Sequence, residues 1–154
     1  MRGYKAMNYD YSSRFGDTYE IGKTYTKEGQ IIYQKNGFHF CVNPEDTLRY
    51  FNGFNDFRMA LVNGEGDLYE RIDEEYEFYG CYVCRTLTFI REIPREELFN
   101  IIINSNEIRV KRFVTLAELS EEEKEEVLYR YPNLKEIIDY YQNKEFVLKR
   151  KLDI

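Results

Sequence analysis

The sequence has no tryptophan and is poor in several other residue types, with one histidine, three prolines and three cysteines among 154 residues. Long apolar runs are also missing. No stretch approaches the roughly 18 consecutive apolar residues that a membrane-spanning helix needs. The first residues, MRGYKAMNYDYSS, contain no apolar signal-peptide core. We therefore expect a protein without membrane spans that stays in the cytoplasm.

Cysteine is scarce and odd in number: Cys41, Cys81 and Cys84 cannot all pair within one chain. Because no export signal precedes them, the expected state is that of reduced thiols in a reducing compartment.

Positive charge is in short supply, since 22 Lys and Arg face 28 Asp and Glu, for a net charge of -6. Nucleic-acid binders neutralise phosphates with clustered Lys and Arg, so direct nucleic-acid binding is not expected. What the chain has in excess is aromatic side chains, 15 tyrosines and 11 phenylalanines, within a hydrophobic content of 43% that suffices for a packed core.

The first 94 residues show short strand signals around one helix. Strands are predicted at residues 3–8, 31–33, 38–41, 58–62 and 82–93. Asn36-Gly37 predicts a tight turn, and Asn43-Pro44 followed by acids predicts a helix start. Residues 67–77 hold six acids and one arginine, which indicates a solvated excursion or a mobile hairpin.

After Pro94 the helical signals become stronger. Helices are predicted at 95–103, from Ser120 to Pro132, and from Asn133 onward, with further strands at 107–113 and 145–152. The predicted fold class is therefore α+β, with short antiparallel strands packed around one or two helices. Residues 1–94 form the principal domain in this interpretation. Residues 95–154 form a C-terminal α/β or helical extension packed on it. The alternative interpretation is that the two parts form one single domain.

A metal site is one chemistry that the sequence raises. His39, Cys41, Cys81 and Cys84 would supply the four ligands of a closed zinc site. However, Cys81 and Cys84 are predicted to enter a strand, where residues i and i+3 point to opposite faces. Buried thiols packed as small hydrophobic groups are the preferred interpretation, and we expect neither a metal nor another cofactor.

An ordered series of short motifs covers roughly the first third of the chain, at residues 5–8, 19–25, 28–29 and 37–46 and at Tyr50 and Phe51. In these motifs the chain resembles an uncharacterised small domain of many phage and prophage proteins, whose hallmark is the run VGKTY…G…GFHxCxNPxDxxxYY. The resemblance implies a phage or bacterial source, hence the host cytoplasm for a phage protein, and it assigns no catalytic residue.

A second resemblance is to ADP-ribosyltransferases. Residues 37–40, followed by a helix that carries Tyr50 and Phe51 and stops near Asn52-Gly53, are similar to the glycine-aromatic strand and the helix that wall the nicotinamide pocket in that family. Residues 4–7 would be the first strand. The resemblance therefore implies a cleft for NAD between these two strands.

Several residues would have roles in such a cleft. Arg2 or Lys5 would face the pyrophosphate, and His39 or Tyr50 would contact the nicotinamide ribose. The transferase reaction also needs a late glutamate to stabilise its oxocarbenium-like transition state. Glu75 and Glu77 are the candidates for that role.

A protein-binding surface is the leading functional hypothesis. Tyrosines in loops offer wide contact area with few rotatable bonds, and they gather here beside carboxylates. The expected contact residues are Tyr76, Phe78, Tyr79, Tyr82, Glu74 and Glu75. The sequence thus favours a small protein that binds a protein partner, for example a host or defence protein that it inhibits or modulates, over the alternative of an ADP-ribosyltransferase-like enzyme or an inactive relative.

Overall fold

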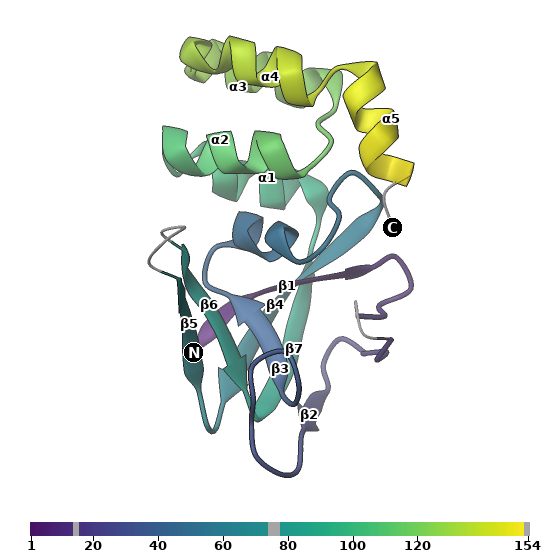
Figure 1. Cartoon of the computed structure of the whole chain (residues 1–154), viewed down its shortest axis with the longest axis vertical. Coiled ribbons are helices and arrows are strands. Elements are labelled where there is room, and N and C mark those ends of the chain that lie inside the picture. Colours follow the sequence, from purple (N-terminus) through teal and green to yellow (C-terminus); the bar gives the residue numbers. More distant parts are fainter. Residues whose placement is uncertain (14–15, 74–77, 153–154) are drawn as a thin grey trace.

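A computed structural model describes residues 1–13, 16–73 and 78–152 (Figure 1). In this part of the chain the strands are β1 (Arg2–Asn8), β2 (Thr24–Thr26), β3 (Phe38–Cys41), β4 (Phe57–Glu65), β5 (Tyr69–Asp73), β6 (Phe78–Cys84) and β7 (Thr86–Ile93). The helices are the 3-10 helices η1 (Pro44–Arg49) and η2 (Pro132–Leu134) and the α-helices α1 (Arg95–Ile103), α2 (Glu107–Leu116), α3 (Glu121–Arg130), α4 (Lys135–Tyr141) and α5 (Lys144–Leu152).

The strands of the described residues form one seven-stranded antiparallel sheet in the order β2-β7-β4-β1-β3-β6-β5. The central strand β1 pairs with β4 along its whole length, from Arg2 opposite Asn63 to Asn8 opposite Phe57. On its other side β1 pairs with β3 only where Tyr4 lies opposite Cys41. The two strands therefore diverge beyond this point, which leaves an opening in the sheet.

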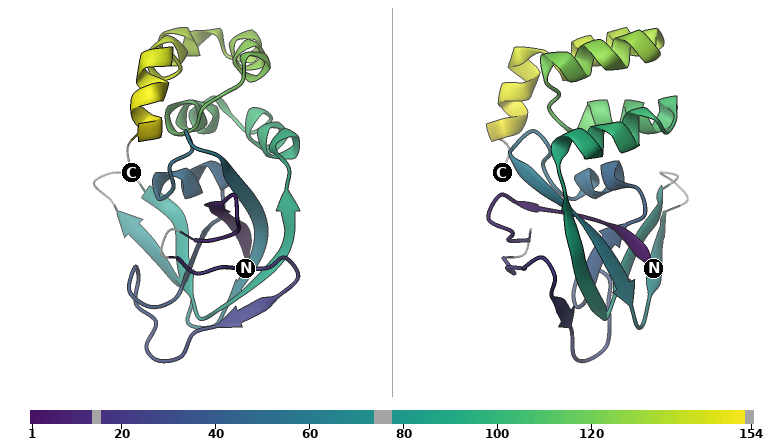
Figure 2. Two further views of the ribbon diagram at one scale, coloured as in Figure 1. Left: turned by 90° about the vertical axis from the view of Figure 1, so that its right-hand side faces the viewer. Right: turned by 180° about the vertical axis from the view of Figure 1, so that it is seen from behind.

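The helices lie at one end of the molecule, with α1 and α2 in a tier next to η1 and α3 and α4 in a second tier beyond them (Figures 1 and 2). Helix α5 runs back from the second tier toward the loop after η1, where the Asn52 side chain donates a hydrogen bond to the carbonyl oxygen of Arg150. One apolar core joins them to the sheet, because Met59 and Ile93 of the sheet cluster with Leu98, Phe113 and other helix residues. A second core contains Phe38, Phe40 and Phe89 and lies within the curved sheet. The α+β fold class predicted from the sequence is thus confirmed.

The ring of Phe40 requires glycine on two neighbouring strands. A Cβ atom added at Gly3 of β1 or at Gly64 of β4 would overlap this ring. The ring is 2% exposed and stacks on Tyr82, with 5.7 Å between ring centroids. The glycines therefore let an aromatic side chain lie flat across β1 and β4, which fixes the position of β3 beside the opening.

Two predicted strands are helices. Residues 107–113 belong to α2, where Asn106 caps the helix by accepting a hydrogen bond from the Arg109 N–H group at 2.9 Å, and Val110, Phe113 and Val114 are buried. Their i, i+3, i+4 spacing suits a helix, and burial against η1, α1 and α4 overrides the β-branched composition. Residues 145–152 belong to α5. Asn143 lies just before this helix, and its side-chain oxygen accepts a hydrogen bond from the Phe146 N–H group.

Other elements differ in detail. Residues 31–33 form only an isolated bridge, Ile32 to Asn36, instead of a strand. The predicted strand 82–93 is two strands that turn at Arg85, and the acidic segment contributes β5, which pairs with β6. The helix expected after Asn43 is the 3-10 helix η1, with Pro44 in its first turn.

The strand at 3–8, the helix at 95–103 and the Ser120 capping box are confirmed. None of the helices in the described part of the chain combines the length and apolar character that a membrane crossing requires.

Candidate functional site

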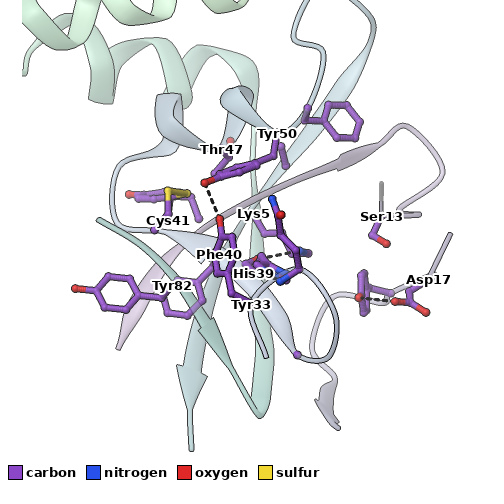
Figure 3. Close-up of a pocket in the computed structure, with 17 residues that line it drawn as sticks. Lys5, Ser13, Asp17, Tyr33, His39, Phe40, Cys41, Thr47, Tyr50 and Tyr82 are labelled. Atoms are coloured by element: carbon purple, nitrogen blue, oxygen red, sulfur yellow. Dashed lines mark hydrogen bonds between the residues drawn. A yellow bond between two sulfur atoms is a disulfide. The ribbon is translucent and has the colours of Figure 1, made fainter. Parts of the chain in front are cut away.

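A pocket opens where β1 and β3 diverge, bounded by η1 and by the loop before β3 (Figure 3). Its volume is about 70 Å³, far below that of pockets that enclose a whole drug-sized ligand. It can therefore take one ring or a small polar group, while the rest of a larger ligand would lie outside. Its lining includes Lys5, Tyr33, His39, Thr47 and Tyr50.

Tyr33 and Tyr50 form the aromatic wall of this pocket. The Tyr33 hydroxyl group donates a hydrogen bond to the Tyr50 hydroxyl group over 2.6 Å, and Arg71 Nη1 also donates to it at 3.3 Å. The Arg71 guanidinium group lies 5.3 Å from the centroid of the Tyr33 ring. Burial, together with the bond from Tyr33, raises the pKa of Tyr50. Tyr50 is thus a neutral hydroxyl group held in place by two donors.

Lys5 brings a positive charge into the pocket from β1. Its Nζ atom donates a hydrogen bond to the carbonyl oxygen of His39 at 2.8 Å. Among the residues that the structure describes, it forms no ion pair with a carboxylate. Burial lowers its pKa from the ordinary 10.5 to about 8. The amine is therefore a costly cation that a bound anion would stabilise.

The His39 imidazole ring holds the loop that covers the pocket. Its Nε2 atom accepts a hydrogen bond from the Gln34 N–H group at 2.8 Å, and its ring makes an edge contact with Tyr33, with centroids 4.7 Å apart. A ring nitrogen that accepts from the backbone carries no proton. His39 therefore positions Tyr33, and its Nε2 atom is not available as a general base in this arrangement.

The cysteines correct the sequence interpretation. Cys41 and Cys81 lie opposite each other in the β3–β6 register and form a disulfide, with 4.1 Å between their Cα atoms. The expectation that these two thiols are reduced is therefore wrong, because strand pairing brings together residues that are 40 positions apart. Cys84 is free and buried in the other core, and burial raises its thiol pKa to about 11.

The four residues considered for zinc are not assembled as a ligand set. Cys41 and Cys81 form the disulfide. His39 accepts a hydrogen bond from the Gln34 N–H group, and Cys84 lies in the core that contains Phe38, Phe40 and Phe89. In the described residues, no group of three or more metal-binding side chains is close enough to hold an ion.

The pocket unites three of the residues named for NAD binding: Lys5, His39 and Tyr50. Arg2 is exposed at the start of β1 and does not line it. Glu75 and Glu77 lie outside the described residues. Sequence reasoning missed Tyr33 and Arg71, since a loop tyrosine and an arginine in an acidic segment have no pattern that predicts their meeting with Tyr50.

Of the predicted protein-binding residues, some lie outside the described part of the chain and others lie on β6. Glu74, Glu75 and Tyr76 lie outside the described residues, as does the side chain of Phe78. Tyr79 on β6 is 53% exposed, whereas Tyr82 is half-buried against Phe40.

The neighbouring edge strand β5 presents Tyr69 and Ile72, which are 54% and 59% exposed. The β5–β6 hairpin therefore carries exposed apolar side chains, although most of the predicted contact set is outside the description.

A larger hollow of about 510 Å³ lies between the sheet and the helices, beside Phe57. Its cations are already paired: Arg95 with Glu123 at 2.9 Å and Lys151 with Glu118 at 2.8 Å. Because Lys5 has no such partner in the described chain, the smaller pocket is the better candidate for a ligand site.

Comparison with known proteins adds a family but no activity. No curated protein and no solved structure matches the chain. Residues 1–101 match the family model described as a domain of unknown function, DUF7666. The matched segment contains the whole sheet and all of the pocket residues named above. Since it covers well over half of the sequence, the chain belongs to the DUF7666 family.

Proposed function

We propose that the pocket binds a small molecule that joins a planar ring to an anionic group, with NAD as the candidate ligand. The observation that carries the proposal is the placement of Lys5 beside an aromatic wall. Its amine lies in the pocket on a half-buried side chain, donates to the His39 carbonyl oxygen at 2.8 Å, and has no ion-pair partner in the described residues. A cation in this setting favours an anionic or strongly polar oxygen of a ligand.

The aromatic wall supports a ring as the second part of the ligand. Tyr33 and Tyr50 offer flat faces and hydroxyl groups, and Arg71 adds positive charge next to them. The volume of about 70 Å³ suits a single ring, so the nicotinamide ring would enter while the adenosine part stays outside. The resemblance of the β3–η1 segment to ADP-ribosyltransferases supports the choice of NAD as the first ligand to test.

The proposal concerns binding. Transfer of ADP-ribose would need a carboxylate near the ribose, and the glutamates proposed from the sequence, Glu75 and Glu77, lie outside the described residues. His39 is engaged by the backbone of Gln34.

Calorimetric titration with millimolar NAD tests the proposal. Wild-type protein should release or absorb heat on binding, and Lys5→Gln should weaken binding about tenfold or more, as expected for loss of a charged hydrogen bond. Lys23→Gln is the matched control, since Lys23 pairs with Glu20 on the surface, away from the pocket. Absence of heat and of a thermal shift with NAD, ADP-ribose and nicotinamide mononucleotide would reject the proposal.

The β5–β6 hairpin supports a second candidate function, binding of a protein partner. Tyr69, Ile72 and Tyr79 are each more than half exposed on or beside an edge strand, where apolar side chains favour association. In a phage-type protein, as the sequence motifs suggest, the partner would be a host or defence protein that is inhibited or modulated.

Pulldown from a host lysate tests this second proposal. A double substitution of Tyr69 and Tyr79 by Ala should abolish capture of a specific protein. Tyr129→Ala is the control, because Tyr129 is 86% exposed on α3, in the helical region. Equal capture by both variants would contradict a binding role for the hairpin.

A further inference from the structure

We propose that Arg109 and Arg112 of α2 are positioning residues for the pocket: they hold η1 from behind, so that Thr47 and Tyr50 form the pocket wall. The inference rests on the proposed function, because it concerns the affinity of the same site. It assigns to the helical region a part in ligand binding that the pocket lining alone does not reveal.

The geometry of η1 separates the side chains that line the pocket from the carboxylates that contact α2. A 3-10 helix has three residues per turn, so side chains at i and i+3 lie above one another. Thr47 and Tyr50 therefore share one row, and both line the pocket. Glu45 and Asp46 occupy the other rows and are buried at 0% and 3% exposure. Figure 1 shows η1 between the sheet and the tier of α1 and α2.

Both buried carboxylates are bound by arginines of α2. Arg109 Nε donates to the two carboxylate oxygens of Glu45 at 2.7 and 3.1 Å, and its Nη2 atom lies 2.7 Å from Oε1. Arg112 Nη1 donates to Asp46 Oδ1 at 3.0 Å, and Arg49 of η1 itself donates to the same oxygen at 3.3 Å. The contacts form a two-point clamp between α2 and η1.

This clamp resists movement of η1. Separating a buried carboxylate from its arginine leaves an uncompensated charge, which costs far more than loss of an exposed ion pair. Leu48, 3% exposed, adds an apolar contact to the same core as Phe113 of α2. A shift of η1 large enough to move Tyr50 would therefore have to break both arginine contacts.

The clamp also lies across the boundary of the family match. Glu45 and Asp46 are inside residues 1–101, whereas Arg109 and Arg112 follow them. The helical region beyond the matched segment thus acts on the pocket through η1, although none of its own residues lines it.

Fluorine NMR of protein labelled with fluorotyrosine tests the clamp without any ligand. Tyr50→Phe identifies the Tyr50 signal. Arg112→Gln should shift or broaden that signal, because Asp46 loses one of the two arginine donors that the described residues give it, and Arg112→Lys should restore it in part. Arg130→Gln is the matched control, since Arg130 bonds to Glu126 of α3 and to Asn104 at the end of α1, and neither contact involves η1. A Tyr50 signal that is identical in Arg112→Gln and wild type overturns the inference.

Titration with NAD provides the second readout. Arg112→Gln should weaken NAD binding by about tenfold, within the range known for substitutions that act through an intermediate element, while Arg130→Gln leaves it unchanged. A Tyr50 signal that moves while NAD binds with wild-type affinity overturns the role in binding. If wild-type protein binds no NAD, the proposed function fails, and the NMR result still decides whether α2 positions Tyr50.

Discussion

The hydroxyl group of Tyr33 donates a hydrogen bond to the hydroxyl group of Tyr50 over 2.6 Å, and this contact joins the loop before β3 to the helix after it. Tyr50 also packs against the Cys41–Cys81 disulfide. The aromatic wall of the pocket is therefore supported by the hydrogen bond between its two hydroxyl groups and by a covalent cross-link, and both can be tested separately.

The hydrogen bond between Tyr33 and Tyr50 should contribute a measurable coupling energy to the free energy of unfolding. Tyr33→Phe and Tyr50→Phe each remove one hydroxyl group, and a double-mutant cycle should give a coupling energy of about 1 kcal/mol in urea unfolding. Tyr129→Phe, on the exposed surface, should change the free energy of unfolding by less than this. A coupling energy of zero would mean that the two hydroxyl groups do not interact in solution.

Reducing the disulfide should destabilise the fold. The bond closes a loop of 40 residues in the unfolded chain, for which chain-entropy arguments give about 2–4 kcal/mol. Cys81→Ser should therefore lower the free energy of unfolding by this amount under non-reducing conditions and equal reduced wild type, whereas Cys84→Ser should remain sensitive to reductant. Thiol titration of the denatured, unreduced protein should find one thiol, Cys84; three thiols would contradict the disulfide.

The buried amine of Lys5 should make stability depend on pH. Its pKa is about 8 in the folded protein and 10.5 ordinarily, so between these values the unfolded chain holds a proton that the folded chain has lost. The free energy of unfolding contributed by Lys5 therefore rises with pH across this window, and below it the full cost of the buried charge is present.

Lys5→Met removes this cost. The variant should be more stable than wild type by up to about 3 kcal/mol near neutral pH, and the difference should shrink as the pH rises from about 8 to 10.5. Urea unfolding at both ends of the window measures it. A difference that is the same at both ends would show that the Lys5 charge is not buried.

The sequence predicts much of the fold through local signals. The Ser120 capping box, with Glu123 three residues later, marks the start of α3. The tight turn predicted at Asn36-Gly37 instead lies just before it, at residues 33–35, where Ile32 bridges Asn36.

The strand predictions at residues 107–113 and 145–152 were wrong, since these segments form α2 and α5. Their apolar residues are compatible with a strand or a helix as long as the surface against which they pack is not known. Burial of Val110 and Phe113 in the core that α2 shares with η1, α1 and α4 decides the case for α2.

The site could be predicted only where its residues belong to a motif. Lys5, His39 and Tyr50 belong to the strand and helix motifs and do meet at one pocket. The Cys41–Cys81 pair and the contact of Arg71 with Tyr50 depend on the register of β3, β5 and β6, which is a long-range property of the sheet. No local pattern carries that information.

The most direct test of a ligand pocket between β1 and β3 is an NMR titration of isotope-labelled protein with NAD. The amide signals of Lys5, Gln34, His39 and Tyr50 should shift in a saturable manner, while those of the exposed α3 residue Tyr129 stay in place. Saturable shifts confined to other regions, or no shifts at millimolar NAD, would contradict the account.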